Sequence, residues 1–209
     1  MTSILLSIFS IFAGIFLMSS ESLGQAQAYK SSKIQLFQIN YSGEKNKSFA
    51  DGGIGFGLEI QSDFGRSWGR VYGKTRGTLA SGRQSFLDGA SQVNCNYTFY
   101  QGQFELGLVL MPIPGREKGM NVFVSGAGTL GYNWLSLTSS TTLSQLKPSD
   151  SASSVGYVTG VGVEWTLGKA LGKKHMLTGE INYRSDRTNL AGQSEFSLTG
   201  LSIHFGYGW

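Results

Sequence analysis

The chain has 209 residues, including 30 Gly, 3 Pro and a single Cys, and a formal net charge of +4. Its length allows one domain, and many glycines with few prolines favour closely packed strands over helices. The lone Cys95 excludes an intrachain disulfide, and the scattered basic residues form no recognised nucleic-acid-binding motif.

The N-terminal segment is apolar. Residues Ile4 to Met18 form an almost unbroken apolar run, which is short for a helix that spans a bilayer. A polar stretch follows, and then the sequence Ala-Gln-Ala at 26–28, a small-x-small pattern that signal peptidase cleaves after. We therefore expect residues 1–28 to be a cleaved signal peptide and residues 29–209 to form one exported domain. A buried N-terminal helix is the alternative.

Export would remove one acidic residue and no basic residue. Without Glu21 the chain keeps 17 basic and 12 acidic residues, a net charge of about +5. This excess favours contact with anionic lipid headgroups or polysaccharide.

From residue 34 to the end, apolar residues alternate with small or polar ones. A strand turns successive side chains to opposite faces, so each such segment has one apolar face. In the last segment, Leu201, Ile203, Phe205, Tyr207 and Trp209 occupy every second position. The expected strands, in chain order, are 34–41, 54–60, 68–78, 103–110, 122–134, 155–167, 177–184 and 201–209. Eight antiparallel strands can close into a barrel that leaves no edge unpaired.

The connections fall into two classes. Short turns are expected at 63–67, 112–119 and 168–175, and long polar loops at 42–51, 79–92, 137–153 and 185–192. Aromatic residues near the strand ends fit two interfacial girdles of a membrane barrel. These residues are Tyr132, Trp134, Tyr157, Trp165, Tyr183, Tyr207 and Trp209.

The polar faces of the strands carry charges that would lie inside such a barrel. An eight-stranded barrel has room inside for side chains only, so buried carboxylates there need cations beside them. A turn centred on residues 64 and 65 would place Arg70 opposite Glu59. We expect an ion-pair network of Glu59, Arg70, Lys74, Glu105, Glu164, Glu180, Arg184 and His204.

The chain resembles the small OmpA/OmpX-like outer-membrane barrels of Gram-negative cells in four features: the export signal, the alternating strands, the two classes of connection and the aromatic C-terminus. The resemblance covers essentially all of residues 29–209. It implies an all-β, eight-stranded antiparallel up-and-down transmembrane β-barrel in the cell outer membrane. It also implies that Gly200, Ile203, Phe205, Tyr207 and Trp209 form the signal read by the barrel-assembly machinery, although the usual last residue is Phe.

As a function, the resemblance implies a monomeric, non-enzymatic barrel among outer-membrane lipid and lipopolysaccharide. Its extracellular loops would contact a surface ligand or support the cell envelope. The strands would serve as a rigid mount for these loops. We expect the lumen to be closed by its own side chains.

Three alternatives remain open from the sequence. A lipid A- or phospholipid-modifying enzyme would need a nucleophile and a base held together near the outer leaflet. Of the only two histidines, His175 falls in an expected periplasmic turn and His204 points inward near the periplasmic end of the last strand, where lumen packing is the favoured role. A small ion channel would use the lumen charges. A soluble, lipocalin-like barrel that binds a hydrophobic ligand would turn the apolar faces of its strands inward. We expect no catalytic residues, no cofactor and no metal site, because His and Cys ligands are not clustered.

Overall fold

The structure is a computed structural model that describes residues 30–42, 48–49, 52–63, 68–112, 119–140, 142–170 and 173–209. The expected signal peptide, residues 1–28, lies outside the described residues. In the part of the chain that is described, no helix is long and apolar enough to cross a membrane.

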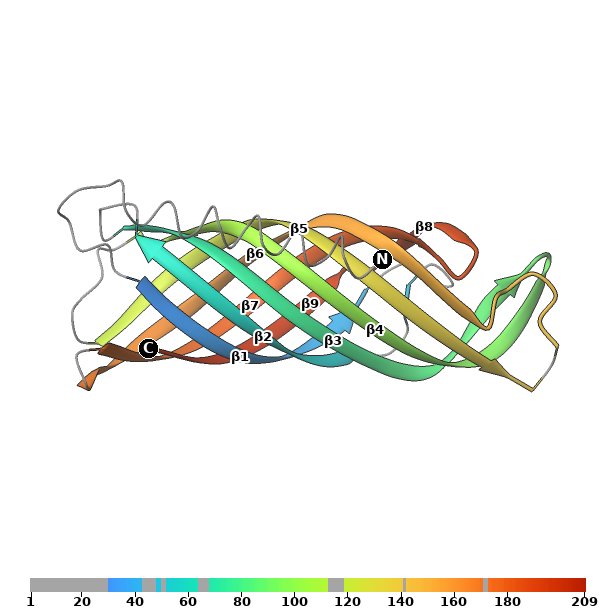
Figure 1. The fold of residues 1–209 in the computed structure, drawn as a ribbon, viewed down its shortest axis with the longest axis horizontal. Coiled ribbons are helices and arrows are strands. Elements are labelled where there is room, and N and C mark those ends of the chain that lie inside the picture. Colours follow the sequence, from blue (N-terminus) through green and yellow to red (C-terminus); the bar gives the residue numbers. More distant parts are fainter. Residues whose placement is uncertain are drawn as a thin grey trace, which may run out of the picture.

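Every regular element of the described chain is a β-strand (Figure 1). The alternation of apolar with small or polar residues suits a pleated ribbon, and β-branched and aromatic residues are common on its apolar face. The strands are β1 (Lys30–Tyr41), β2 (Gly53–Asp63), β3 (Gly69–Asp88), β4 (Ser91–Leu110), β5 (Gly119–Ser139), β6 (Ser149–Ala170), β7 (Lys173–Leu190), β8 (Gln193–Ser197) and β9 (Gly200–Gly208).

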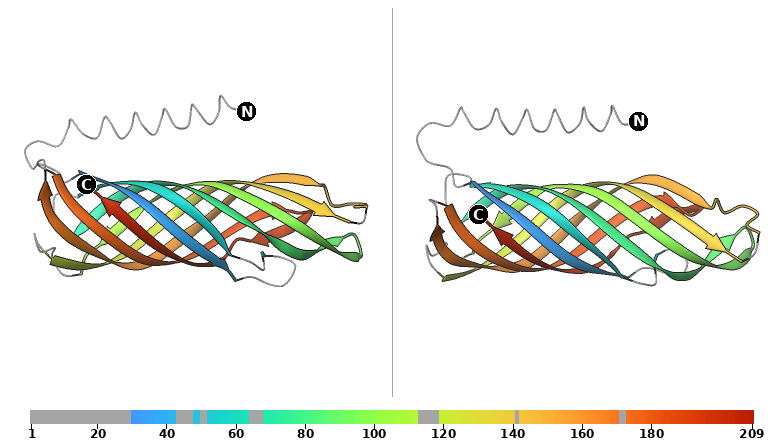
Figure 2. Two further views of the ribbon diagram at one scale, coloured as in Figure 1. Left: turned by 90° about the horizontal axis from the view of Figure 1, so that it is seen from below. Right: turned by 60° about the horizontal axis from the view of Figure 1, so that its bottom comes forward.

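The strands close into a ring (Figures 1 and 2). Strands β1 to β7 pair antiparallel in chain order, and β9 pairs with both β7 and β1. The short β8 pairs only with the outer part of β7, beyond the ring. The predicted all-β, eight-stranded antiparallel up-and-down barrel is therefore confirmed.

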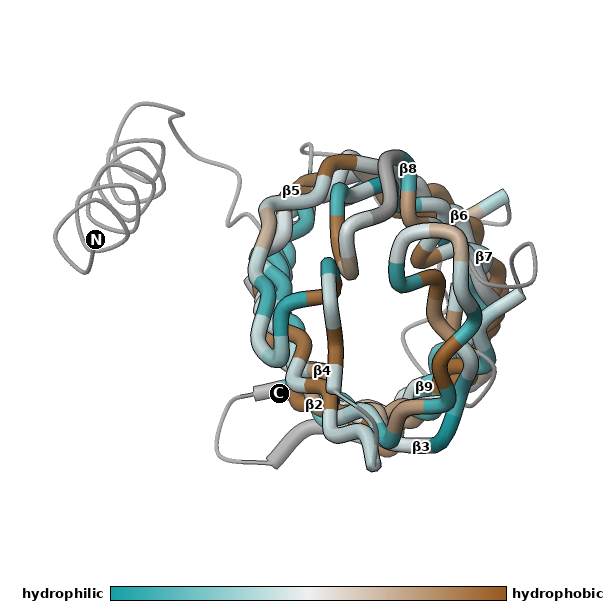
Figure 3. The backbone as a smooth tube through the Cα atoms, turned by 90° about the vertical axis from the view of Figure 1, so that its right-hand side faces the viewer, coloured by the Kyte–Doolittle hydropathy of each residue, from teal (hydrophilic) through white to brown (hydrophobic). Residues whose placement is uncertain are grey.

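The two chain ends of the barrel meet at one end of the ring. The backbone N–H groups of Ser32 and Trp209 each donate to the other's carbonyl at 2.9 Å. We call this the terminal end. The opposite end, where residues 89 and 90 join β3 to β4, is called the hairpin end, and Figure 3 views the ring from there.

The strands are tilted, because the pairing is staggered around the ring. Gly208 pairs with Met176 of β7 on one side. In the other direction, successive pairs run from Gly208 through Lys33, Glu59, Lys74, Glu105, Thr129 and Gly156 to Asp186, also in β7. The row of paired residues that starts at Gly208 therefore returns to β7 at Asp186, ten residues nearer the hairpin end than Met176. Such a stagger belongs to strands tilted by about 40°.

The central strands extend further than the sequence pattern predicts. Strands β3 and β4 stay paired up to Asp88 and Ser91, so the expected long loop at 79–92 is wrong. Strand β5 continues to Ser139 and β6 begins at Ser149, so the loop expected at 137–153 is also shorter. The last expected loop, 185–192, contains the end of β7 and a turn at 191 and 192.

The side-chain pattern changes along the barrel axis, and this explains the missed strand lengths. Over most of the barrel, large apolar side chains point outward and polar ones inward. Toward the hairpin end, the outward positions are polar, such as Ser81, Arg83 and Asn96, while aromatic residues turn inward. Because membrane strands are predicted from outward apolar residues, segments with polar outward residues are predicted as loops. Here they belong to regular strands.

Candidate functional site

The barrel interior holds a layer of charged side chains. In one row of directly paired residues across β1 to β4, Lys33, Glu59, Lys74 and Glu105 follow one another. Opposite charges thus stand on adjacent strands of the same face, the arrangement that stabilises cross-strand pairs. All four side chains are buried.

One group of ion pairs is centred on Glu164 of β6. Its carboxylate accepts a 2.8 Å hydrogen bond from Arg70 Nη1 and lies 3.6 Å from Lys33 Nζ. Arg70 also contacts Asp63 through Nε at 3.1 Å and donates to Gln61 Oε1 at 3.1 Å. Glu164 joins β6 to β1 and β3 across the lumen, so this group spans the barrel interior.

A second group is centred on Lys74. Its ammonium lies 3.7 Å from Glu59 Oε2 and 3.9 Å from Glu180 Oε2. Ser125 donates a 2.8 Å hydrogen bond to Glu180. Glu59 also lies 3.6 Å from Lys33, which links this group to the first.

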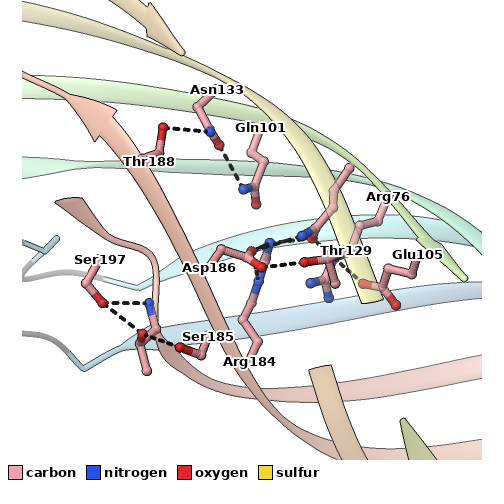
Figure 4. A network of polar contacts seen from close by, with 12 residues as sticks. Arg76, Gln101, Glu105, Thr129, Asn133, Arg184, Ser185, Asp186, Thr188 and Ser197 are labelled. Atoms are coloured by element: carbon pink, nitrogen blue, oxygen red, sulfur yellow. Dashed lines mark hydrogen bonds and ion pairs between the residues drawn. The ribbon is translucent and has the colours of Figure 1, made fainter. Parts of the chain in front are cut away.

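A third group lies nearer the hairpin end (Figure 4). Arg76 Nε contacts Glu105 at 2.8 Å and donates to Gln103 Oε1 at 2.7 Å. Arg184 pairs with Asp186 on the same strand, and Asp186 accepts hydrogen bonds from Gln103 Nε2 at 2.9 Å and from Thr129 Oγ1 at 2.5 Å. This group connects β3, β4, β5 and β7.

The buried charges of this layer balance. A carboxylate or a cation without a partner is very costly in a water-poor interior, while a closed set of pairs recovers much of that cost. Within this layer of the described chain, five buried cations (Lys33, Arg70, Lys74, Arg76 and Arg184) face five buried carboxylates (Glu59, Glu105, Glu164, Glu180 and Asp186).

His204 lies inside the barrel but belongs to a different environment. Its Nε2 atom forms a 2.8 Å hydrogen bond with Ser202 Oγ, and its ring stacks on Phe37 with 4.7 Å between centroids. It pairs through the backbone with Glu180, yet its side-chain contacts are with Ser202 and Phe37. His175 lies in β7 at the terminal end, where Nδ1 is 2.5 Å from the Tyr207 hydroxyl.

The predicted register of the second hairpin is wrong. Glu59 pairs with Lys74, and Arg70 pairs with Asp63, so Arg70 does not stand opposite Glu59. The pairing of the two strands is therefore symmetric about a point nearer to β3 than residues 64 and 65. Tyr72 is buried inside the barrel with the cations, and Trp68, just before β3 begins, is exposed.

Three members of the charged layer were not predicted from the sequence: Lys33, Arg76 and Asp186. Lys33 precedes the first predicted strand, Arg76 shares the parity of Lys74, and Asp186 was assigned to a loop. Extending the alternation by two residues at each strand end identifies Lys33 and Asp186, and Arg76 already lies on the inward face of the expected strand 68–78.

Two apolar clusters pack inside the barrel. Tyr72, Val109, Met111 and Phe123 pack together beside the charged layer, where Lys33 Nζ lies 5.7 Å from the centre of the Phe123 ring. Toward the hairpin end, the buried cluster has fifteen members: Ile39, Tyr41, Phe49, Ala80, Phe86, Cys95, Tyr97, Phe99, Leu135, Leu137, Leu146, Leu190, Ala191, Phe196 and Leu198. We call this larger set the hairpin-end core.

The hairpin-end core is held by ring packing and by a clasped loop. Phe49 contacts Tyr97, Phe99 and Phe196 with ring centroids 4.5 to 5.0 Å apart. Asp88 accepts backbone hydrogen bonds from Gln145 at 2.5 Å and from Leu146 at 2.7 Å, which fixes the loop that places Leu146 in the core.

The described residues contain no group of three or more His, Cys, Asp or Glu side chains arranged to hold a metal ion. The carboxylates of the interior are engaged with Lys and Arg side chains instead. Their arrangement fixes strands to one another across the lumen.

Comparisons with known proteins agree with this fold. No protein-family model matches the chain, and no curated protein matches it. Neisserial surface protein A is 10% identical, with 89% of this chain and 97% of that chain covered and a TM-score of 0.50. Ail of Yersinia pestis, solved with the heparin analogue sucrose octasulfate, is 16% identical, with 88% and 100% covered and a TM-score of 0.49. OprG from Pseudomonas aeruginosa is 13% identical, with 86% and 95% covered and a TM-score of 0.48.

At 10% identity, the likeness to Neisserial surface protein A shows a shared fold alone, that of a small outer-membrane β-barrel. The resemblance in fold drawn from the sequence is confirmed.

Proposed function

We propose that this chain is an integral outer-membrane barrel without enzymatic activity, which presents loops at its hairpin end to the cell exterior. The observation that carries the proposal is the outward belt of large apolar side chains on a closed ring. Leu36, Phe56, Leu130, Val155 and Phe205 are each more than half exposed. A soluble protein rarely exposes so large an apolar area, whereas lipid solvates it.

The layered interior supports a closed lumen. Each lumen carboxylate of the charged layer has a cation or a hydrogen-bond donor beside it. One apolar cluster packs beside the layer, and the hairpin-end core lies beyond it. An ion entering the barrel would have to displace the buried aromatic rings of the hairpin-end core and then break ion pairs. We therefore assign a structural role to Glu59, Arg70, Lys74, Glu105, Glu164, Glu180 and Arg184, with His204 as a packed lumen residue.

The hairpin end is the part that would meet partners. Its outward positions on β3 to β6 carry Ser, Thr and Asn with the exposed Arg83. With an exported net charge of about +5, surface polysaccharide or another acidic envelope component is the partner class that we propose. The barrel would be a monomer.

The terminal strand would direct assembly. Strand β9 closes the ring with β1 and β7, and Ile203, Phe205 and Tyr207 point outward along it. We propose that these residues, with Gly200 and Trp209, are the signal for the barrel-assembly machinery, following export with a cleaved segment 1–28.

The membrane assignment is tested by fractionation together with gel migration. A folded barrel stays compact in detergent until it is boiled, so we expect outer-membrane recovery and a shift in migration on heating. Spin labels at Leu106 and Glu105 provide the decisive readout. Lipid-dissolved quenchers should reach the label at position 106 and not the label at 105; the reverse would contradict the proposal.

Two further measurements separate the alternatives. Purified protein in planar bilayers should give no discrete conductance, and a conductance that changes with Glu105→Gln would establish a channel instead. Incubation with lipid A or phospholipid vesicles should leave the lipid masses unchanged. A mass shift would establish an enzyme.

A further inference from the structure

A groove crosses the outer wall of the barrel between two rows of side chains. The first row consists of the directly paired residues Phe205, Leu36, Phe56, Gly77 and Gly102. The second row, two residues nearer the hairpin end on every strand, consists of Ile203, Gln38, Ile54, Leu79 and Tyr100. Both rows line the groove, which encloses about 890 Å³.

The floor of the groove is formed by the residues between the two rows, including Phe37, Gly55, Thr78 and Gln101. The groove therefore follows the hydrogen-bonding direction of the sheet rather than a single strand. It crosses β9, β1, β2, β3 and β4, four interstrand steps, which gives a length of about 19 Å.

A pair of outward glycines gives the groove its depth. Gly77 and Gly102 pair directly with each other on β3 and β4. If a Cβ atom were added to Gly102, no heavy atom would lie within 4 Å of it. A Cβ added to Gly77 would contact only the Phe56 ring, at 3.7 Å, so both glycines border open space. Elsewhere on this wall an outward glycine faces a large side chain, as Gly128 faces Leu106.

The groove rises toward the hairpin end as it passes from β9 to β4, because the paired rows climb in that direction. Its upper end lies at Tyr100, whose ring centroid is 6.4 Å from that of Trp134. Aromatic side chains with hydrogen-bonding groups mark the level where hydrocarbon meets headgroups. The groove thus opens at the headgroup level and leads down into the hydrocarbon region.

From this geometry we propose that the groove binds one saturated acyl chain of an outer-leaflet glycolipid with the chemistry of lipid A. The inference rests on the membrane insertion proposed above. A straight chain advancing about 1.25 Å per methylene needs about 15 carbons to fill 19 Å, given carbon–carbon bonds of about 1.5 Å. A cis double bond would kink the chain out of a straight groove.

The charge above the groove suits a phosphorylated headgroup. Arg83 is exposed on β3, four positions beyond Leu79, and so stands roughly 10 Å above the upper end of the groove. Its outward guanidinium lies where the phosphate of a lipid with its chain in the groove would be.

Photocrosslinking in vesicles tests the proposal. Wild-type protein is inserted into bilayers that contain either a lipid A-type glycolipid with a diazirine on a saturated chain or a phospholipid with the same group on a cis-unsaturated chain. Mass spectrometry then maps the labelled residues. We expect the glycolipid to label the two rows that line the groove.

Gly102→Leu fills the groove and should reduce this labelling roughly fivefold, since it replaces the contacts that a bound chain would make. Gly128→Leu is the matched control, because its Cβ also points to open space and it lies outside the groove. It should label like the wild type.

Equal labelling of the groove in wild type and Gly102→Leu would overturn the inference, as would equal labelling by the unsaturated phospholipid. Heat-modifiable migration of all three proteins is measured in parallel. A chain that fails to insert would overturn the proposed function itself, while normal insertion without groove labelling would overturn this inference alone.

Discussion

Glu164 shows how a single buried carboxylate depends on its partners. Its side chain is fully buried, and it accepts a hydrogen bond from Arg70 and lies near Lys33. Transfer of the carboxylate from water costs several kcal/mol, which the two cations offset only together. At the residue scale, the stabilisation from each ion pair of the charged layer thus depends on its neighbours, and the pairs do not contribute independently to stability.

Arg70→Met should destabilise the barrel by about 3 to 5 kcal/mol, because it leaves Glu164 and Asp63 short of a cation. The double variant Arg70→Met, Glu164→Met should recover a large part of this loss, since it removes the buried charge as well. Reversible unfolding in urea with lipid vesicles, followed by tryptophan fluorescence, measures both. Arg83→Met, at an exposed position, is the control, and an equal effect of the two single variants would contradict the expected role.

Asp88 makes the loop at the hairpin end sensitive to acid. Backbone hydrogen bonds from residues 144 to 146 hold the pKa of this carboxyl at about 2, below its ordinary value of 3.8. Because the folded-state pKa is lowered, the stabilisation of the loop is complete above about pH 4 and is lost as the pH falls toward 2.

We therefore expect hydrogen exchange to show protected amides at Gln145 and Leu146 at pH 5 and a loss of protection near pH 2.5, after correction for intrinsic rates. Asp88→Asn should reduce protection at pH 5 and remove most of the pH dependence. Protection that is unchanged in this variant would show that the packing of Leu146 holds the loop without the carboxylate.

At the scale of elements, the inward and outward side chains alternate without interruption along each long strand, although their polarity reverses between the hairpin end and the rest of the barrel. Along β4, the inward positions Cys95, Tyr97 and Phe99 are apolar, and the inward positions Gln101, Gln103 and Glu105 are polar. The outward positions change in the opposite sense, from Asn96 to Leu106. The same strand thus has polar outward and apolar inward side chains near the hairpin end, and apolar outward and polar inward side chains along the lipid-facing wall.

Phe99→Ala should remove a central ring of the hairpin-end core and destabilise that end by about 3 to 5 kcal/mol, because the cavity cannot be refilled by lipid or water. Thr98→Ala, on the neighbouring outward position, should change stability by less than about 0.5 kcal/mol. Hydrogen exchange of the β3–β4 hairpin measures the local loss. Equal protection in the two variants would contradict the assignment of an apolar core at this end.

The elements also show what the sequence was able to predict. Alternation predicted eight strands and the inward side of Glu59, Glu105, Glu164 and Glu180, because a period of two is a local property. The register of the β2–β3 hairpin was not predictable, since several turn lengths keep the same parity and only the pairing of Lys74 with Glu59 distinguishes them. The hairpin-end core was missed because its outward residues resemble those of a loop.

At the scale of the whole molecule, the inward and outward positions of the ring differ in the space beside them. Closure requires every strand to find both neighbours, so an obstruction in one place affects the whole barrel. A Cβ on the inward Gly162 would lie 2.4 Å from the Phe123 ring and 2.7 Å from a backbone carbonyl. A Cβ on the outward Gly126 would meet no heavy atom within 4 Å.

Gly162→Val should therefore prevent closure, since the backbone carbonyl of Gly179 cannot move without separating β6 from β7. Gly126→Val carries the same change in size on the neighbouring strand β5 and should fold, because lipid accommodates the added methyl groups. The fraction of compact protein on unheated gels measures closure. Since an unclosed ring leaves unpaired peptide groups in lipid, at several kcal/mol each, we expect the compact band to disappear rather than to weaken gradually. A compact band of normal intensity for Gly162→Val would mean that the interior at this level is wider than the packing of Phe123 against Gly162 allows.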